Sequence, residues 1–287
     1  MRCSFQLHRL PPTNLMNKNI DYSEEQAHTI ALELIRQHAH SEQFRALQGA
    51  FSPSDISSAY RVQDAYVETL LNQRNTSVAG FKIALTTPAM RQMVGFHDSV
   101  FGKIFLDQVL QSGESIVASD YRRLIIEFEI AFRIFEDVPL RTTPWTGFEI
   151  LKYAPNAYAA LEIADDRSAQ YDTLKAAILT LVSDNAWNQG LVLGSSFACN
   201  EYEALGEIQG MAFIDGKEVG RGMGRDVLGN PADALAWLAN SLAANGKTLK
   251  AGSLVSTGSL VKSQFPVSNQ SVSFKLQGYG AVQIEVR

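Results

Sequence analysis

The sequence predicts an α+β domain built on a mixed, strongly bent β-sheet, with the N-terminal helices packed against it. Helical periodicity is confined to the front of the 287-residue chain and to a segment near residue 235, whereas many short strand-like runs fill the middle and the end. A doubly wound parallel sheet needs strands that alternate with helices and a glycine-rich turn between them. The segment Gly220-Arg221-Gly222-Met223-Gly224 is only superficially similar, because it follows an expected hairpin.

We predict one domain over residues 20–287, made of a helical part at 20–77 and a β-rich part at 78–287. Residues 1–19 contain no continuous apolar core, so a secretory signal is not expected and the segment is interpreted as a disordered extension. Met1 and Met16 are then alternative natural starts.

The composition excludes several classes of protein. A net charge of -5 without a basic block argues against a nucleic-acid or anionic-membrane surface. The longest apolar runs are much shorter than the roughly 20 residues that cross a bilayer. The two cysteines, Cys3 and Cys199, are far apart and lack metal-ligand spacing, which favours a reducing cytoplasm over a disulfide framework or a zinc site.

Three helices are expected from their boundary residues. Ser23-Glu24-Glu25-Gln26 has the form of a capping box before an amphipathic segment. A second helix is expected near Ser52-Pro53, with Pro53 at its first position, and a third begins at Asn230-Pro231 and ends at Asn245-Gly246.

The remaining elements are short. Thr87-Pro88 predicts a helical piece through Met93, whereas Leu174 to Val182 fits either a helix or a strand. Asp215-Gly216 predicts a hairpin with a type I′ turn. Strands are expected at 78–85, 123–135, 158–167, 253–257 (ending at Gly258-Ser259), 272–276 and 281–286. A turn at 111–114 leads into 115–117, and 189–194 is a further apolar segment.

Two carboxylates stand two residues apart in the apolar run 123–135. In a strand, Glu127 and Glu129 share one face, while Phe128, Ile130, Phe132 and Ile134 form the opposite, buried face. A buried like-charged pair needs a positive partner, and Mg²⁺ or Mn²⁺ suits carboxylate oxygens better than Zn²⁺ does. The alternative is an exposed edge strand with two solvated glutamates.

Other candidate residues have a structural and a functional interpretation. Lys82, the single charge in its strand, either reaches solvent or meets an anion. Glu162 is a carboxylate among apolar neighbours, and Asp165-Asp166-Arg167 either organise a pocket or close a turn. Ser183-Asp184-Asn185 forms a turn or lines a cavity mouth. His97 is an acid or base near neutrality, or a surface residue.

The chain resembles the fumarylacetoacetate hydrolase superfamily over roughly residues 20–287, within its 2-keto-4-pentenoate hydratase and 4-oxalocrotonate decarboxylase branch. The resemblance rests on six blocks in the family's order: Gly80-Phe81-Lys82-Ile83; Glu127-Phe128-Glu129-Ile130-Ala131-Phe132; Leu161-Glu162-Ile163 with Asp165 and Arg167; Asp184-Asn185-Ala186; Asn230-Pro231 with Ala236-Trp237-Leu238-Ala239-Asn240; and Leu249-Lys250-Ala251-Gly252 with Thr257-Gly258-Ser259. It implies a sheet roll like that of the fumarylacetoacetase C-terminal domain.

The resemblance also implies roles for individual residues. Glu127, Glu129 and Glu162 are expected to bind one Mg²⁺ or Mn²⁺, which a 2-oxo acid chelates and which stabilises a dienolate. Lys82 and Asp184 are expected to be catalytic. Ser183, Asn185 and Ser259 are expected to bind substrate, and Asp165 and Arg167 to support the metal site from behind.

The function implied is that of a metal-dependent lyase, which ketonises a 2-hydroxy-2,4-dienoate and adds water to give a 4-hydroxy-2-oxo acid in aromatic meta-cleavage catabolism. Alternatives are a 4-oxalocrotonate-type decarboxylase, an acylpyruvate hydrolase and a non-catalytic partner subunit. The hydrolase interpretation is weaker, because His97 has no nearby glutamate in the sequence.

A homo-oligomer is expected from the resemblance, with association with a paralogous subunit as the alternative. The sequence departs from the family's usual residues at Ala84, Asp98-Ser99, Asp166, Phe128 and Ala186-Trp187. Trp187 and Phe128 are bulkier than the common residues, so a reshaped substrate pocket is expected.

Overall fold

The computed structural model describes residues 23–287, so the interpretation of residues 1–19 and the choice between Met1 and Met16 lie outside the described part. Two helices come first. Helix α1 (Glu24–Ala39) has the predicted capping box of Ser23 and Gln26. Helix α2 (Ile56–Arg74) begins later than the predicted Pro53, because the Asp55 side chain accepts from the Ser58 amide and thereby caps the helix.

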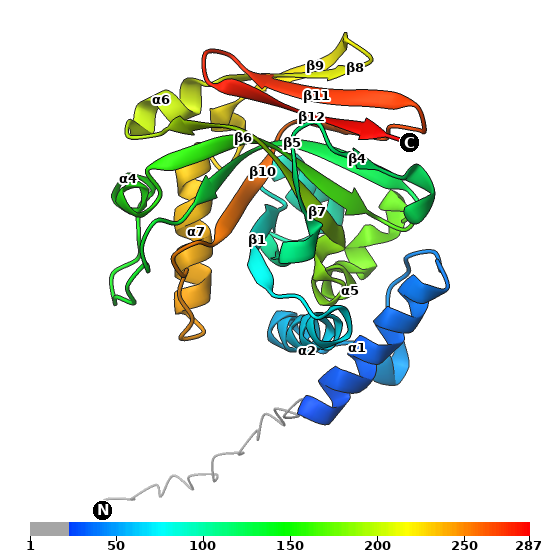
Figure 1. The fold of residues 1–287 in the computed structure, drawn as a ribbon. Coiled ribbons are helices and arrows are strands. Elements are labelled where there is room, and N and C mark those ends of the chain that lie inside the picture. Colours follow the sequence, from blue (N-terminus) through cyan, green and yellow to red (C-terminus); the bar gives the residue numbers. More distant parts are fainter. Residues whose placement is uncertain (1–22) are drawn as a thin grey trace, which may run out of the picture.

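The larger sheet has seven strands and is mixed. Strands β1 and β10 are parallel, as are β3 and β7, whereas the other neighbouring pairs are antiparallel. Figure 1 shows this sheet strongly curled, which confirms the predicted fold class. In order across the sheet, the strands are β2 (Val100–Phe105), β1 (Val78–Ala84), β10 (Leu254–Gln264), β5 (Leu124–Arg133), β6 (Asn156–Asp165), β7 (Asn188–Ala198) and β3 (Val109–Gln111).

A second sheet of five strands lies across the curled one (Figure 1). Its hairpin turn has Asp215 at φ 51° and Gly216 at φ 74°, both left-handed, as a type I′ turn requires. The order is β4 (Ser115–Ile116), β12 (Gly280–Val286), β11 (Gln270–Leu276), β8 (Gln209–Ile214) and β9 (Lys217–Met223).

Shorter helices connect the strands. The ambiguous stretch 174–182 is helical, ending in α5. The other α-helices are α3 (Pro88–Val94), α4 (Gly147–Ile150), α5 (Ile178–Ser183), α6 (Tyr202–Glu207) and α7 (Pro231–Ala243). The 3-10 turns are η1 (Gly49–Phe51), η2 (Leu106–Gln108), η3 (Ala118–Asp120), η4 (Leu151–Tyr153), η5 (Tyr171–Ala176), η6 (Asn185–Trp187) and η7 (Gly224–Asp226).

One prediction about strand length is wrong. Strand β10 continues past Gly258-Ser259 to Gln264, because it stays paired with β5 through repeated shifts of register after Ser256. Such bulges bend a strand and increase its twist, which helps the sheet to curl around the site.

Strand β5 is an interior strand. It pairs with β10 on one side and with β6 on the other, which excludes the exposed-edge interpretation of its two glutamates. Its apolar face is buried as predicted: Phe128, Ile130 and Phe132 are 0% exposed. These residues belong to the main hydrophobic core, which includes inward-facing residues of both sheets.

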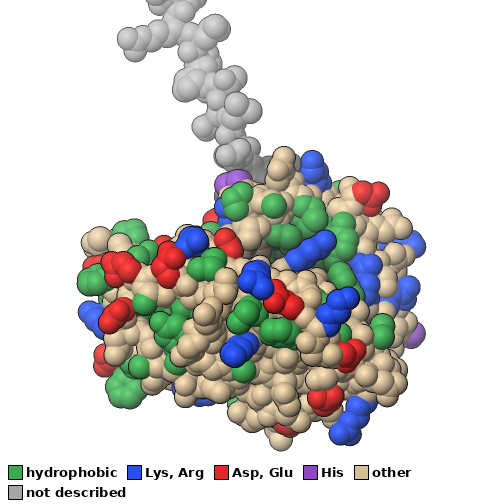
Figure 2. All heavy atoms as spheres, turned by 90° about the horizontal axis from the view of Figure 1, so that it is seen from above, with side chains coloured by type: hydrophobic (Ala, Val, Ile, Leu, Met, Phe, Trp, Pro, Cys, Tyr) green, Lys and Arg blue, Asp and Glu red, His purple; other side chains and the backbone are tan. Residues whose placement is uncertain are grey.

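A second hydrophobic cluster lies where α3, η5 and α5 meet. We call it the α3–α5 cluster; its buried members include Leu85, Val94, Leu174, Leu181 and Ala186. Figure 2 shows side chains of both charge signs on the face seen from above. Within residues 23–287, no helix is long and apolar enough to span a bilayer.

Candidate active site

Strand register brings three glutamates together. Glu127 and Glu129 lie on one face of β5, and Glu162 on β6 is the direct cross-strand partner of Glu127. One carboxylate oxygen from each lies within 4.8 Å of the other two. We call these residues the glutamate cluster. Like charges opposite one another in a sheet are destabilising, so this arrangement calls for a compensating cation.

Glu129 is held by strand β10. Its Oε2 accepts from the Ser256 hydroxyl and from the Gly258 amide, the latter at 2.9 Å. Gly258 has φ +109°, and a Cβ there would stand 2.4 Å from the Thr86 hydroxyl oxygen, so only glycine can present this amide. Ser256 was not among the predicted site residues, although it lies next to the Thr257-Gly258-Ser259 block on which the family resemblance rests.

The other two glutamates have their own partners. Lys82 Nζ lies 2.8 Å from Glu162 Oε1, which also accepts from the side-chain amide of Asn188 at 3.2 Å. Glu127 Oε1 accepts from the Ser263 hydroxyl at 2.6 Å. Asn188 and Ser263 were also missed, because only the folded register of β7 and β10 brings them beside the glutamates.

The electrostatics of the cluster are unbalanced, because three carboxylates face one ammonium. Burial, followed by the charges of Glu162 and Glu127, raises the pKa of Glu129 well above its ordinary value. Burial and Glu127 also raise the pKa of Glu162, against the opposing effect of Lys82. Burial alone would lower the pKa of Lys82, but Glu162 and Glu127 outweigh it and raise the pKa.

Two oxygens of the cluster fit a metal ion. Glu129 Oε1 and Glu162 Oε2 are buried and have no hydrogen-bond partner among the described residues. A buried carboxylate oxygen without a partner is costly, and an ion bound to it removes that cost. An all-oxygen donor set is what Mg²⁺ and similar hard cations prefer. The residues present therefore fit a divalent cation.

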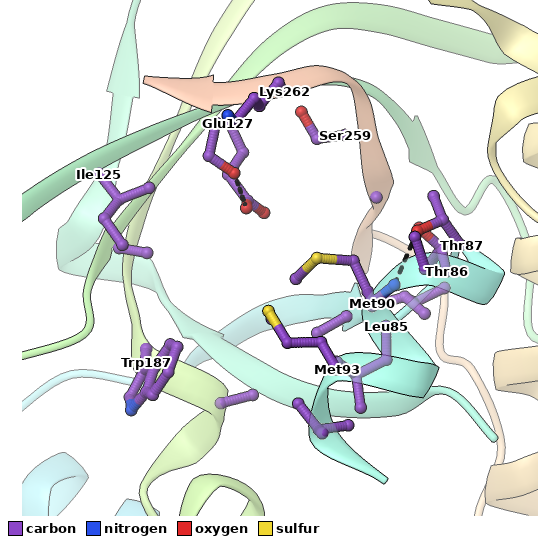
Figure 3. A pocket seen from close by; sticks show the side chains of 18 of the residues that line it. Leu85, Thr86, Thr87, Met90, Met93, Ile125, Glu127, Trp187, Ser259 and Lys262 are labelled. Carbon is purple, nitrogen blue, oxygen red and sulfur yellow. Dashed lines mark hydrogen bonds between the residues drawn. The ribbon is translucent and has the colours of Figure 1, made fainter. Parts of the chain in front are cut away.

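A cavity of about 440 Å³ opens beside this cluster. Lys82, Glu127 and Ser259 are among its lining residues, and Figure 3 shows Glu127 and Ser259 at one end of it. The Ser259 hydroxyl accepts from the Phe128 amide at 2.8 Å and donates to the Val261 carbonyl at 2.7 Å. Of the predicted site residues, these three lie where a ligand held by the glutamates would lie.

Asp184 lies in a different cluster, which we call the aspartate cluster: Asp184, Arg167 and His38. Asp184 Oδ2 accepts from Arg167 at 2.6 Å, and Oδ1 lies 2.6 Å from His38 Nε2. Burial opposes ionisation of Asp184, but Arg167 and His38 outweigh it and lower its pKa. Both carboxylate oxygens are thus engaged, and Asp184 is not among the cavity-lining residues.

Three further predicted residues form hydrogen bonds to backbone groups. The Ser183 hydroxyl donates to the Leu179 carbonyl at 2.9 Å. The Asn185 side chain accepts from the Lys103 amide at 2.6 Å and donates to the Lys103 carbonyl at 2.8 Å. Asp165 accepts from three backbone amides, those of 122, 123 and 167. Like Asp184, these residues hold segments of chain and do not line the cavity.

The aspartate cluster supports a strained turn. Asn185, Ala186 and Trp187 all have left-handed φ values, of 52°, 50° and 64°, which cost roughly 1–3 kcal/mol each outside glycine. The guanidinium of Arg167 donates to Asp184 and not to the glutamates. Arg167 therefore stabilises the residue that precedes this turn, rather than orienting the glutamates as predicted. Ala186 and Trp187 line the cavity, which links the turn to the site.

Comparisons with known proteins give both sequence relatives and structural neighbours. No family model matches the chain. A 2-keto-4-pentenoate hydratase of Burkholderia vietnamiensis (strain G4 / LMG 22486) is 31% identical over 206 residues, which cover 72% of this chain and 76% of the relative. A 2-oxo-hept-4-ene-1,7-dioate hydratase of Escherichia coli is 29% identical over 243 residues, covering 83% and 90%.

Solved structures share the fold. A 4-oxalocrotonate decarboxylase from Pseudomonas putida G7, complexed with magnesium and adipate, superposes with a TM-score of 0.83 at 21% identity, covering 92% of this chain and 98% of that one. A putative fumarylacetoacetate hydrolase family protein from Yersinia pestis CO92 gives a TM-score of 0.57 at 15% identity, covering 72% and 92%.

The fold defines a structural class: the chain shares the architecture of these two solved structures and carries the glutamate cluster. Within it, sequence identity over most of the chain places the protein among the lyases. The chain belongs to the 2-keto-4-pentenoate hydratase family.

Proposed function

We propose that this protein is a divalent-metal-dependent hydratase that adds water to a 2-hydroxy-2,4-dienoate and forms a 4-hydroxy-2-oxo acid. One observation carries the proposal: two buried glutamate oxygens have no partner in the described part of the chain, beside a cavity that Lys82 also lines. Relatives named as hydratases support the reaction class. A place in aromatic meta-cleavage catabolism belongs to the same proposal.

Glu127, Glu129 and Glu162 would hold the ion, and Mg²⁺ is our first choice because the decarboxylase neighbour is complexed with magnesium. Mn²⁺ is the second choice, because it accepts the same oxygen ligands. The bound metal supplies charge that favours the enolate form of a 2-oxo acid. The hydrogen bonds from Ser256, Gly258 and Asn188 orient the carboxylates toward that role.

Lys82 is the group we assign to the reacting end of the substrate. Its side chain is buried and lines the cavity, with Nζ anchored to Glu162. As an ammonium it would pair with the substrate carboxylate or donate a proton to the dienolate. Conjugate addition then needs a water molecule at the unsaturated end, where the cavity continues past the glutamates.

Asp184 remains a predicted catalytic residue, but its contacts support a positioning role through the turn at 185–187. Ser259, which lines the cavity, stays the best candidate for a substrate contact. The contacts of Ser183 and Asn185 favour a supporting role for both residues.

The test is an assay of the purified full chain with 2-hydroxypenta-2,4-dienoate and with 4-oxalocrotonate, each with Mg²⁺ and with chelator. We expect metal-dependent loss of the dienoate absorbance and a 4-hydroxy-2-oxo acid product. Turnover of 4-oxalocrotonate alone, with release of CO₂, would replace the hydratase by the decarboxylase. No response to either substrate would favour a non-catalytic subunit, and its size-exclusion profile alone and with a paralogue would then be measured.

A further inference from the structure

The cavity has two chemically different ends. Glu127 and Ser259 lie at one end, while Met90 and Met93 of α3 point into the space from below, opposite Trp187 (Figure 3). Leu85 lies behind the two methionines. The end away from the glutamates is therefore walled by apolar side chains, with Thr86 and Thr87 as uncharged polar residues beside Met90.

The wall of that apolar end is formed by residues of the α3–α5 cluster. Leu85, Val94, Leu174 and Leu181 line the cavity and are at most 5% exposed, because they are buried members of the α3–α5 cluster. Residues held by a close-packed core do not rearrange easily around a polar group. A substrate tail that enters this end meets a fixed hydrophobic wall.

Positive charge is missing from that end. Among the described residues that line the cavity, the cations are Lys82 and Lys262. Lys82 is paired with Glu162 at the other end, and Lys262 is exposed and lies beside Glu127 in Figure 3. A second carboxylate on the substrate would be buried without a cation to meet it.

Two arginines near the cavity are already engaged. Arg91 on α3 donates to the Leu85 carbonyl at 3.1 Å, which holds its guanidinium on the backbone. Arg123 donates to both carboxylate oxygens of Asp166. Arg91 is thereby held on the backbone of its own segment and Arg123 is neutralised by Asp166, and neither guanidinium lines the cavity.

We infer that this enzyme selects 2-hydroxy-2,4-dienoates whose distal end is a neutral alkyl or aryl group and rejects the corresponding dioates, with Met93 and Trp187 as specificity-determining residues. The inference rests on the proposed function and deepens it. The physical basis is that burying an unpaired carboxylate is costly, whereas each apolar carbon that leaves water is stabilising.

The test compares three substrates that differ only at C5 of the dienoate: hydrogen, isobutyl and carboxymethyl. Isobutyl and carboxymethyl have the same number of non-hydrogen atoms and similar shape, so charge is the main difference. We expect kcat/KM for the isobutyl substrate to exceed that for the carboxymethyl substrate by about 100-fold or more. Equal or better turnover of the carboxymethyl substrate would overturn the inference.

A variant pair tests where the selection arises. Met93→Lys places a cation at the apolar end and should lower the isobutyl-to-carboxymethyl ratio by about 10-fold or more, whereas the neutral, similar-sized Met93→Gln should lower it less. Lys262→Gln should leave the ratio near its wild-type value. A ratio that changes with Lys262 and not with Met93 would place the recognition of the tail elsewhere and contradict the assignment.

A binding measurement separates this inference from the proposed function. Saturated 2-oxo acids with isobutyl and carboxymethyl tails can be titrated into the Mg²⁺-loaded wild-type protein by calorimetry, without turnover. Tighter binding of the isobutyl analogue supports the inference even if no dienoate is hydrated. In that case the proposed function is wrong and the preference for an apolar tail is retained. Hydration of the unsubstituted dienoate combined with tighter binding of the carboxymethyl analogue would retain the function and remove the inference.

Discussion

Two buried groups of carboxylates lie close to the cavity, and they differ in how far nearby cations and hydrogen-bond donors compensate their charge. In the aspartate cluster, Asp184 has a partner for each oxygen, with Arg167 on one and His38 on the other. In the glutamate cluster, Glu129 and Glu162 each retain one buried oxygen without a partner within residues 23–287. The carboxylate of the first cluster is fully paired, whereas the second cluster keeps two oxygens that fit a cation.

The direction of the pKa shifts expresses the same difference. Arg167 and His38 lower the pKa of Asp184 in spite of its burial. Burial and like charges raise the pKa of Glu129. A buried carboxylate with compensating cations is stabilised where it lies, whereas buried carboxylates without them concentrate at functional sites. Removing one carboxylate from each cluster should therefore give opposite results.

The largest effect is expected from Glu129→Gln. Losing an outer hydrogen bond to a metal ligand typically costs 10- to 100-fold, so losing a ligand itself should lower Mg²⁺-dependent kcat/KM by more than about 100-fold. In chelator, the melting temperature should stay level or rise, because a buried like charge has been removed. Steady-state kinetics and thermal melts measure the two effects.

Glu136→Gln is the matched control, because Glu136 is exposed and lies just beyond the same strand. It should change neither activity nor melting temperature. Full Mg²⁺-dependent turnover by Glu129→Gln would remove the glutamate cluster from the mechanism.

The second prediction is that Asp184→Asn is mainly destabilising. It leaves the guanidinium of Arg167, a residue 1% exposed, without a counter-ion, which costs about 3–5 kcal/mol of unfolding free energy. Urea unfolding at neutral pH measures the loss. Activity per folded molecule, at a temperature where the variant is folded, should fall far less than in Glu129→Gln.

Asp137→Asn provides the control, since Asp137 pairs with Lys250 on the surface and should contribute little. If Asp184→Asn keeps its stability but loses turnover as completely as Glu129→Gln, Asp184 is catalytic and the contrast between the clusters is wrong.

The third prediction concerns the hydrogen bonds that orient the glutamates. Ser256→Ala removes a donor from Glu129 inside the fully buried part of the cluster and should weaken Mg²⁺ activation by about 10- to 100-fold. Ser263→Ala removes the donor to Glu127, where both residues are half-buried, and should have a smaller effect. Titrating activity with Mg²⁺ gives the activation constant of each variant. A larger effect of Ser263→Ala than of Ser256→Ala would show that Glu127 depends more on its hydrogen bond than Glu129 does.

Much of the fold could be predicted because it depends on local signals. The capping box at Ser23, the Asp215-Gly216 turn and the alternation around Phe128 each act over a few residues. The pairing of Glu127 with Glu162 depends on register between strands far apart in sequence, and the glutamates were placed together only through the family resemblance. The length of β10 was missed because its bulges follow from contacts with β5.

The assignment of chemistry to Asp184 shows a different limit. A polar triplet between apolar segments fits a cavity mouth or a turn, and the sequence does not show which cations lie beside it. Arg167 is 17 residues away and His38 is 146 residues away. Only the folded arrangement shows that Asp184 is neutralised, while two neighbours along the chain, Ala186 and Trp187, reach the cavity.

The smallest expected effect is a pH dependence of opposite sign in the two clusters. Asp184 has a folded-state pKa below its ordinary value of 3.8, so its stabilisation is present above that value and is lost as the pH falls through the folded pKa. The difference in unfolding free energy between wild type and Asp184→Asn should therefore shrink below about pH 3.8.

Glu129 has a folded pKa raised from 4.5, so in chelator its ionisation lowers stability as the pH rises above that value. Glu129→Gln should remove that decline, whereas Asp184→Asn should retain it. Urea unfolding in chelator between pH 3 and pH 8 measures both trends, and slopes of the same sign at the two sites would show that the clusters do not differ in charge balance.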